Sequence, residues 1–293
     1  TAVYLRLLGH EISNGGFVLD VNETPDPEEF EDAYMRYANA RVCPPRPAEK
    51  TYRVRGTQEP FYTLNVIDGI MSVSAVQKVA KQYQASITEY LNAVLLYSLL
   101  QKQEHDFHLR LRPVRIAMPV NLRRFFPSKT LRNFITMVYP SIDPRLGDYT
   151  FEEIVTQVHH YMRYYINSKF LRGDITTNAS TQRNPLIRIV PLFLKDFVVR
   201  QFYQRVQDKN SSAGLTNMGA IRVPDDMKPY LERFDIYMGI PYSQRTNCAI
   251  VSFEDTLTVN FASCIIEADV ERRFFQKLVE DGIPVTIESN REL

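Results

Sequence analysis

The sequence predicts an α/β fold, in which a mixed β-sheet and a set of flanking helices form two layers. Helical spacing of apolar residues follows recognisable capping residues, such as Ser86 with Glu89. Between the helical segments lie short runs that alternate with a period of two, such as residues 114–120. A hairpin with Glu254-Asp255 at its turn requires antiparallel pairing, so we expect a mixed sheet.

Helices are predicted wherever apolar residues recur every three or four positions. Residues 2–8 have the pattern of the last turns of an amphipathic helix, and Gly9 could end it. No capping residue precedes this helix, so we expect the chain to have been cut from a longer one. Thr150 with Glu153 forms a second capping box. The predicted helices cover residues 2–8, 28–38, 76–83, 86–99, 150–165, 186–206 (broken near Pro191) and 269–281.

Strands are predicted in the short apolar or alternating runs between these helices. Pro119 lies inside one of them and indicates the edge of the sheet or the end of a ladder, because proline has no N–H to donate. The predicted strands cover residues 61–70, 114–120, 134–139, 213–217, 234–238, 248–253, 256–266 and 283–287.

Charge and composition exclude several classes of partner. A net charge of +1 provides no field that would attract nucleic acid. No run of about 18 apolar residues predicts a membrane span. The widely spaced Cys43, Cys248 and Cys264 do not suggest a disulfide framework, which favours a reducing, cytoplasmic location. The apolar and basic residues of 186–206 suit a membrane-surface helix, but Pro191 and Asp196 favour a helix packed on a sheet.

The sequence lacks the motifs of most enzyme classes. It contains no G-x-S-x-G, glycine-rich phosphate loop, H-E-x-x-H or paired C-x-x-C, which argues against most hydrolases, nucleotide-binding proteins and zinc proteins. His159-His160 is similar to the start of the H-H-x-x-x-D signature of one acyltransferase superfamily. However, Tyr164 occupies the place of the Asp and the pair falls within a predicted helix, so we interpret it as ordinary helix surface. His105 and His108 are interpreted as loop residues rather than metal ligands.

Several local patterns, taken in order, resemble one family. Residues 114–134 read V-R-I-A-M-P-V-N-L-R-R-F-F-P-S-K-T-L-R-N-F, and residues 213–219 read A-G-L-T-N-M-G. Together with the helix at 86–93, the ending at 270–287 and the helix at 4–10, they resemble the second part of the condensation-domain and alcohol acetyltransferase-like superfamily, which has the chloramphenicol acetyltransferase-like fold. Two features depart from the pattern: Arg132 stands where the family usually has glycine, and the sequence has no D-F-G-W-G.

The resemblance implies a division of the chain and an activity. Residues 1–57, polar and turn-rich from residue 20, would be the end of an N-terminal lobe and a linker, and residues 58–293 the C-terminal acyltransferase lobe. In the family a histidine activates an alcohol, amine or thiol acceptor, which attacks the thioester of an acyl-CoA or acyl-carrier donor. That histidine would lie in the missing N-terminal lobe, so we expect no catalytic residue, bound metal or tightly bound cofactor in this chain, with acyl-CoA as the co-substrate.

The resemblance also implies which residues line the substrate channel. Thr216 and Asn217 are expected near the acyl carbonyl or the acceptor, although Asn217 ahead of Gly219 equally suits a strand end in a turn. Asn121, Arg123 and Asn133 are expected along the channel wall or as braces of the loop after their strand.

Two hypotheses remain at this level. One is an acyltransferase fragment that works with its N-terminal lobe. The other is a non-catalytic binding or assembly module with the same fold. In either case the isolated piece is a candidate homodimer, since the face that a partner lobe would cover should be apolar.

Overall fold

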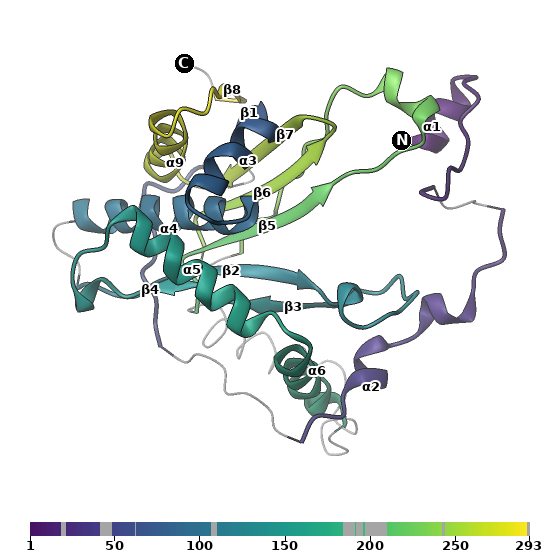
Figure 1. Ribbon diagram of the computed structural model, residues 1–293, viewed down its shortest axis with the longest axis horizontal. Coiled ribbons are helices and arrows are strands. Elements are labelled where there is room, and N and C mark those ends of the chain that lie inside the picture. The colour runs from purple at the N-terminus through teal and green to yellow at the C-terminus, as the bar shows by residue number, and fades with distance from the viewer. Residues whose placement is uncertain are drawn as a thin grey trace.

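The computed structural model describes residues 1–18, 22–41, 49–61, 63–106, 110–183, 210–241 and 244–291, together with positions 191 and 196. Figure 1 shows one sheet with helices packed beside it. The helices are α1 (Ala2–Leu7), α2 (Ala33–Tyr37), α3 (Val73–Gln82), α4 (Ile87–His105), α5 (Phe151–Tyr165), α6 (Ser168–Arg183) and α9 (Asp269–Glu280), with short 3₁₀ turns η1 (Pro27–Phe30), η2 (Leu122–Arg124), η3 (Pro144–Leu146) and η5 (Asp225–Tyr230). The strands are β1 (Asn65–Ser72), β2 (Val114–Asn121), β3 (Ile135–Val138), β4 (Ser141–Ile142), β5 (Ala213–Ala220), β6 (Thr246–Phe253), β7 (Thr256–Ser263) and β8 (Thr286–Ser289).

The sheet is mixed, as the sequence predicts. Its strands run in the order β3-β2-β5-β6-β7-β1-β8, and β4 also pairs with β2. The pairs β2–β5 and β5–β6 are parallel, and the remaining pairs are antiparallel. The hairpin β6–β7 has Phe253 opposite Thr256, so its turn is the predicted Glu254-Asp255. Glu254 adopts a positive φ of 52°, as expected in a two-residue hairpin turn.

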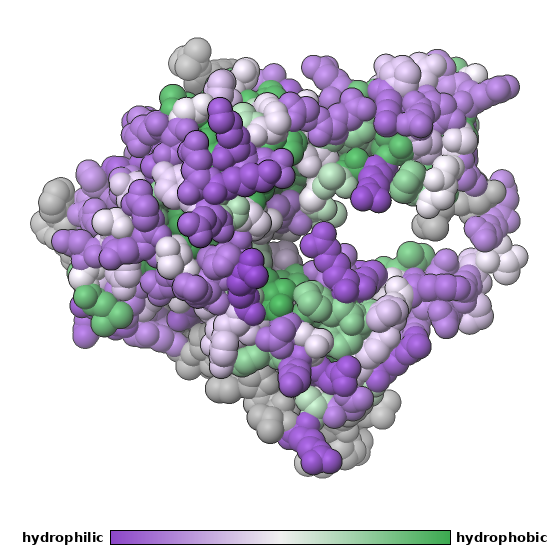
Figure 2. Space-filling model, viewed as in Figure 1, coloured by the Kyte–Doolittle hydropathy of each residue, from purple (hydrophilic) through white to green (hydrophobic). Residues whose placement is uncertain are grey.

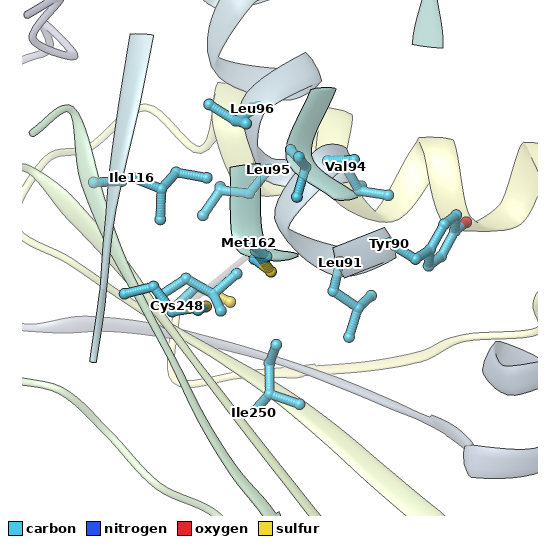
Figure 3. Packing of buried hydrophobic residues seen from close by; sticks show 14 of the residues in the cluster. Tyr90, Leu91, Val94, Leu95, Leu96, Ile116, Met162, Cys248 and Ile250 are labelled. Atoms are coloured by element: carbon cyan, nitrogen blue, oxygen red, sulfur yellow. The ribbon is translucent and has the colours of Figure 1, made fainter. Parts of the chain in front are cut away.

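Helix α4 forms the centre of the helical layer. Leu91 and Leu95 on α4 pack toward Ile116 of β2 and Ile250 of β6, and Met162 of α5 lies among them (Figure 3). Buried residues lie all round this helix and not only on the predicted apolar stripe. They include the polar residues Asn92, Ser98 and Gln103. A helix buried on every side lies inside the domain rather than on its surface.

Both predicted capping boxes are confirmed. The Glu89 N–H donates to Ser86 Oγ over 3.3 Å, and the Ser86 N–H donates to Glu89 Oε2 over 2.7 Å. Thr150 and Glu153 repeat the arrangement at α5. Each box satisfies N–H groups that have no partner within the helix, and so fixes the residue at which the helix begins.

A small second core lies apart from the main one. Ala2 and Leu5 of α1 pack with Ile12 and with Met227 of η5. The C-terminal end of α1 turns at Gly9, whose φ is 90°, as the sequence predicts. In Figure 1 this unit stands out from the sheet beyond the end of β5. The arm, as we call residues 1–18 with 221–231, therefore joins the N-terminus to the β5–β6 connection.

The predicted domain boundary at residues 57 and 58 stays a prediction. Within the predicted linker, Ala33, Ala38, Tyr52 and Val54 are buried in the main core cluster. This part of the linker therefore packs against the 58–293 lobe.

Other predicted elements differ in their limits. β1 begins at Asn65 instead of Phe61, and β8 begins at Thr286 instead of Ile283. α6 and β4 are not in the prediction. Apart from positions 191 and 196, the predicted helix at 186–206 lies outside the described residues. In the described part of the chain, no helix is long and apolar enough to cross a membrane.

The predicted strand at 234–238 is wrong. These residues have no ladder partner, and side chains of the sheet hold them instead. The Ile236 N–H donates to Asn260 Oδ1 over 3.2 Å, and Thr258 Oγ1 donates to the Phe234 carbonyl over 2.8 Å. We call residues 231–241 the strap, because they cross the face of the sheet opposite the helices. Alternating apolar residues predict a strand equally well for a segment paired in a ladder and for one held by side chains of the sheet.

The strap lies over a buried carboxylate. Asp68 accepts hydrogen bonds from Asn260 Nδ2 (2.8 Å) and from the hydroxyl of Tyr237 (2.9 Å). Burial raises the pKa of Asp68, against the lowering effect of these two bonds. Asp235 lies close by, because it accepts from the same Asn260 amide over 3.1 Å, and it pairs with Arg233.

We expect Asp68→Asn to change how stability depends on pH. The folded state holds the Asp68 proton more tightly than the unfolded state, so wild-type unfolding free energy falls as pH rises from about 4 through the raised pKa. The variant has no carboxyl group at this position and does not lose stability in this way. Its free energy of unfolding, measured by urea denaturation, should therefore rise relative to that of wild type between pH 4 and pH 7. The exposed Asp148→Asn serves as control. A stability difference from wild type that is equal at both pH values would contradict the prediction.

We expect Gly69→Ala to destabilise the fold by about 1–3 kcal/mol. A Cβ at Gly69 on β1 would overlap the ring of Phe275, which is itself wedged against Phe261 and Phe274. Gly239→Ala is the matched control, since no atom lies within 4 Å of its added Cβ. It should change the unfolding free energy by less than about 0.5 kcal/mol. Equal losses in the two variants, measured by urea denaturation, would contradict this packing.

Candidate functional site

Two parallel strands in the middle of the sheet separate toward their carboxyl ends. β2 and β5 pair only at Ile116 with Ala213 and at Ala117 with Gly214. Their ladder thus ends two residues before Pro119, so the predicted ladder end holds on the β5 side of β2, while Pro119 still pairs with Met137 of β3. Beyond this point β5 continues toward the arm, while β2 continues with β3 (Figure 1). Open α/β sheets commonly bind ligands where neighbouring strands diverge at their carboxyl ends.

Side chains do not close the space between the two diverging parts. Figure 2 shows an opening in the molecule, with the arm above it and the loop between β2 and β3 together with α2 below it. Hydrophilic residues form much of its rim in this view. All five predicted channel residues lie on the strands or loops that leave the sheet at this end: Thr216, Asn217, Asn121, Arg123 and Asn133.

Thr216 and Asn217 point to opposite faces of the sheet. Successive side chains of a strand alternate, and the register confirms the two rows. Asn217 is in line with Ile250, Val259 and Gly69, which face the helices. Thr216 is in line with Ala249, Asn260 and Asp68, on the face that the strap crosses. The two residues therefore cannot act as one pair of side chains on one face.

Asn217 is held at both ends of its amide. Its Nδ2 donates to Thr88 Oγ1 over 2.8 Å, and its Oδ1 accepts from the Gly219 N–H over 2.8 Å. Gly219 has a φ of 74°, and the β5–β6 register shifts between Asn217 and Ala220. Asn217 thus makes the turn that the sequence allows, yet the strand continues to Ala220. Among the residues that the structure describes, the second N–H of the amide has no partner.

Thr88 is a site residue that the sequence analysis missed. It lies in the first turn of α4, two positions after the capping Ser86, and its hydroxyl contacts Asn217. Its local pattern gave no signal, because Thr88 lies between Ile87 and Glu89 at the polar start of the helix. The Thr216 hydroxyl, in contrast, makes no hydrogen bond with any residue that the structure describes.

Asn121 and Arg123 brace the loop that follows β2. Asn121 Oδ1 accepts from the Arg123 N–H over 3.1 Å and so caps η2. The Arg123 guanidinium donates to the carbonyls of Thr130 and Arg132, each over 2.7 Å. Asn133 is exposed at the base of the same loop. The loop on the lower side of the opening is therefore fixed by its own polar side chains.

The histidines lie elsewhere. His159 and His160 are in the middle of α5, as expected, and His159 Nδ1 lies 3.3 Å from Glu89 Oε1 without hydrogen-bond geometry. His10 packs against Tyr230 in the arm, with the ring centroids 4.2 Å apart and the planes tilted by 36°. His105 is at the far end of α4 from Thr88, about 25 Å along the helix. His108 is outside the described residues.

No group of side chains in the described ranges has the composition of a metal site. Cys248 and Cys264 are free thiols, and Cys43 is not among the described residues. A hollow of about 650 Å³ runs along α5, lined by residues such as His160, Tyr161 and Tyr164. It contains none of the predicted channel residues, so it is a separate surface feature.

Comparison with known proteins identifies the fold. No protein-family model and no curated protein matches the sequence. Among solved structures, the nonribosomal peptide synthetase FmoA3 matches with a TM-score of 0.53 at 11% identity, over 80% of this chain and 23% of that one. The epimerization domain from the third module of tyrocidine synthetase B matches with a TM-score of 0.50 at 12% identity, over 96% of this chain and 63% of that one.

A trichothecene 15-O-acetyltransferase from Fusarium sporotrichioides also matches, with a TM-score of 0.45 at 14% identity, over 90% of this chain and 53% of that one. The chain thus spans less than two thirds of each of these proteins. The mixed sheet, its helical layer and the first two superpositions agree with the resemblance seen in the sequence. The chain has the chloramphenicol acetyltransferase-like fold that condensation domains and related acyltransferases share.

Proposed function

We propose that the chain is the C-terminal part of an acyltransferase that moves an acyl group from a CoA-type thioester to an alcohol or amine. The observation that carries the proposal is the divergence of β2 and β5, with Asn217 at the resulting opening and one of its amide N–H groups unpartnered within the described ranges. The shared fold supports it. An opening between strands admits donor and acceptor from different sides, so that the two meet in a fixed orientation.

The proposed reaction is an ordinary acyl transfer. A histidine of the N-terminal lobe takes the proton of the acceptor hydroxyl or amine, and the acceptor attacks the thioester carbonyl carbon. The free N–H of Asn217 stabilises the oxyanion that develops on the carbonyl oxygen. The C–S bond then breaks, and the leaving thiolate takes the proton from the histidine. Asn121 and Arg123 hold the loop on one side of the route, and the exposed Asn133 lies at the base of that loop. Thr216 lies on β5, on the other side of the route.

The arm gives the proposed N-terminal lobe a surface to pack on. Tyr4 and Leu7 of α1 and the C-capping Leu8 are each more than half exposed, and Leu7 is 81% exposed. Phe17 beside them is also exposed. Large apolar side chains gathered on one short helix usually mark a contact surface.

Substitution of Asn217 tests the proposed role. In the full-length protein, Asn217→Ala should lower kcat about 100-fold, because it removes an oxyanion donor. Activity is measured as release of CoA thiol from a panel of acyl-CoAs with alcohols and amines. Asn39→Ala, at an exposed asparagine two residues after the end of α2, is the matched control and should retain wild-type activity.

The panel also separates the two candidate functions. A full-length protein that folds but transfers no acyl group to any acceptor would contradict the acyltransferase proposal. It would favour the non-catalytic binding module, which needs the fold but no proton acceptor. Activity that survives Asn217→Ala unchanged would instead remove Asn217 from the mechanism.

We expect the exposed face of α1 to drive self-association of the 293-residue chain. Leu7→Lys should shift its mass toward the monomer in sedimentation velocity, because a charge replaces an apolar contact. Leu146→Lys is the control, since Leu146 is 80% exposed at η3, away from the arm. If both variants associate like wild type, α1 is not the contact surface.

A further inference from the structure

A line of polar groups joins the two strands that flank the opening. Thr88 and Asn92 lie one turn apart on α4 and so share a face of the helix. Thr88 contacts Asn217 of β5, and Asn92 Nδ2 donates to the sulfur of Met118 on β2 over 3.4 Å. Asn92 is completely buried. The helix thus spans the gap between β5 and β2 with polar side chains, at a place where apolar ones would suffice for packing.

These polar groups have a cost that packing does not explain. Asn92 Oδ1 is buried and accepts no hydrogen bond from any described residue. An unsatisfied amide oxygen in the interior destabilises the fold, because its hydrogen bonds to water are lost and not replaced. The same side chain donates from Nδ2 to the Thr88 carbonyl over 2.8 Å. Its orientation therefore fixes the turn of α4 that carries Thr88.

Two contacts, one with Gly219 and one with Thr88, determine the orientation of the Asn217 amide. A backbone N–H can only donate, so the contact with Gly219 places Oδ1 on that side of the amide. Nδ2 must then face Thr88 Oγ1, which accepts one of its two hydrogens. The amide is planar, so the direction of the second N–H follows from these two contacts. Without the Thr88 hydroxyl, one of the two anchors is lost.

We propose that Thr88 is a positioning residue for the acyl transfer, and that Asn92 supports it from within the helix. This inference rests on the proposed function, because it assigns a task to the amide of Asn217. Thr88 does not contact substrate. It holds the free N–H of Asn217 in the direction of the developing oxyanion. Because α4 contacts both β5 and β2, this direction depends on the distance between the two strands.

The test compares three variants of the full-length protein with acetyl-CoA and the most reactive acceptor of the panel. Thr88→Val keeps the shape of the side chain but removes the acceptor oxygen. It should lower kcat about tenfold or more and leave KM for acetyl-CoA within about twofold, since only the transition state loses a contact. Thr88→Ser restores the oxygen and should restore kcat. Asn92→Ala should lower kcat in the same direction by loosening the turn.

The double variant Thr88→Val/Asn217→Ala is the decisive measurement. If Thr88 acts only through Asn217, the double variant should be no slower than Asn217→Ala alone. Additive losses, or a Thr88→Val enzyme with wild-type kcat beside an impaired Asn217→Ala enzyme, would overturn the positioning role and leave the proposed function intact. Wild-type kcat in both single variants would remove Asn217, and Thr88 with it, from the mechanism.

Loss of folding is kept apart from loss of positioning. Melting temperatures are measured for each variant, and a Thr88→Val protein that does not fold is replaced by Thr88→Ala, which adds no branched methyl group to the helix. A fall in kcat that Thr88→Ser does not rescue counts against the inference, because a loss through packing would not depend on the hydroxyl.

Discussion

The burial of α4 is the constraint on which the rest of the structure depends. The sheet covers one side of this helix, and α5 and α9 cover others, so almost every side chain between Glu89 and Leu100 is inaccessible to water. The helix must therefore begin at one defined residue, and the capping box at Ser86 and Glu89 fixes it. The position of Thr88, and through it of Asn217, follows from that starting point.

The two faces of the sheet are built on different principles. Toward the helices, paired residues such as Cys248 and Phe261 form an apolar layer. The opposite face carries Asp68, Thr258 and Asn260, which are buried beneath the strap and hydrogen-bonded to it or to each other. Since the candidate site lies where β5 leaves this sheet, Thr216 and Asn217 belong to these two different environments.

Much of the fold could be predicted because its signals are local. The capping boxes, the hairpin turn at Glu254 and the glycine end of α1 each depend on a few neighbouring residues. The strap could not be predicted, because the same alternation suits a ladder or a segment held by Asn260 and Thr258. Thr88 was missed for a related reason: its partner, Asn217, is 129 positions away along the chain.

The attachment of the strap has a consequence for how such proteins diverge. The strap backbone is hydrogen-bonded to side chains of the sheet, namely those of Thr258, Asn260 and Asn247. The strap forms no ladder with any strand, so the strand pairing of the sheet does not depend on it. Insertions and substitutions in this connection can accumulate while the strand register stays the same. Related chains can therefore acquire differently shaped coverings over an unchanged scaffold, and sequence alignment will fail first in the stretch between β5 and β6.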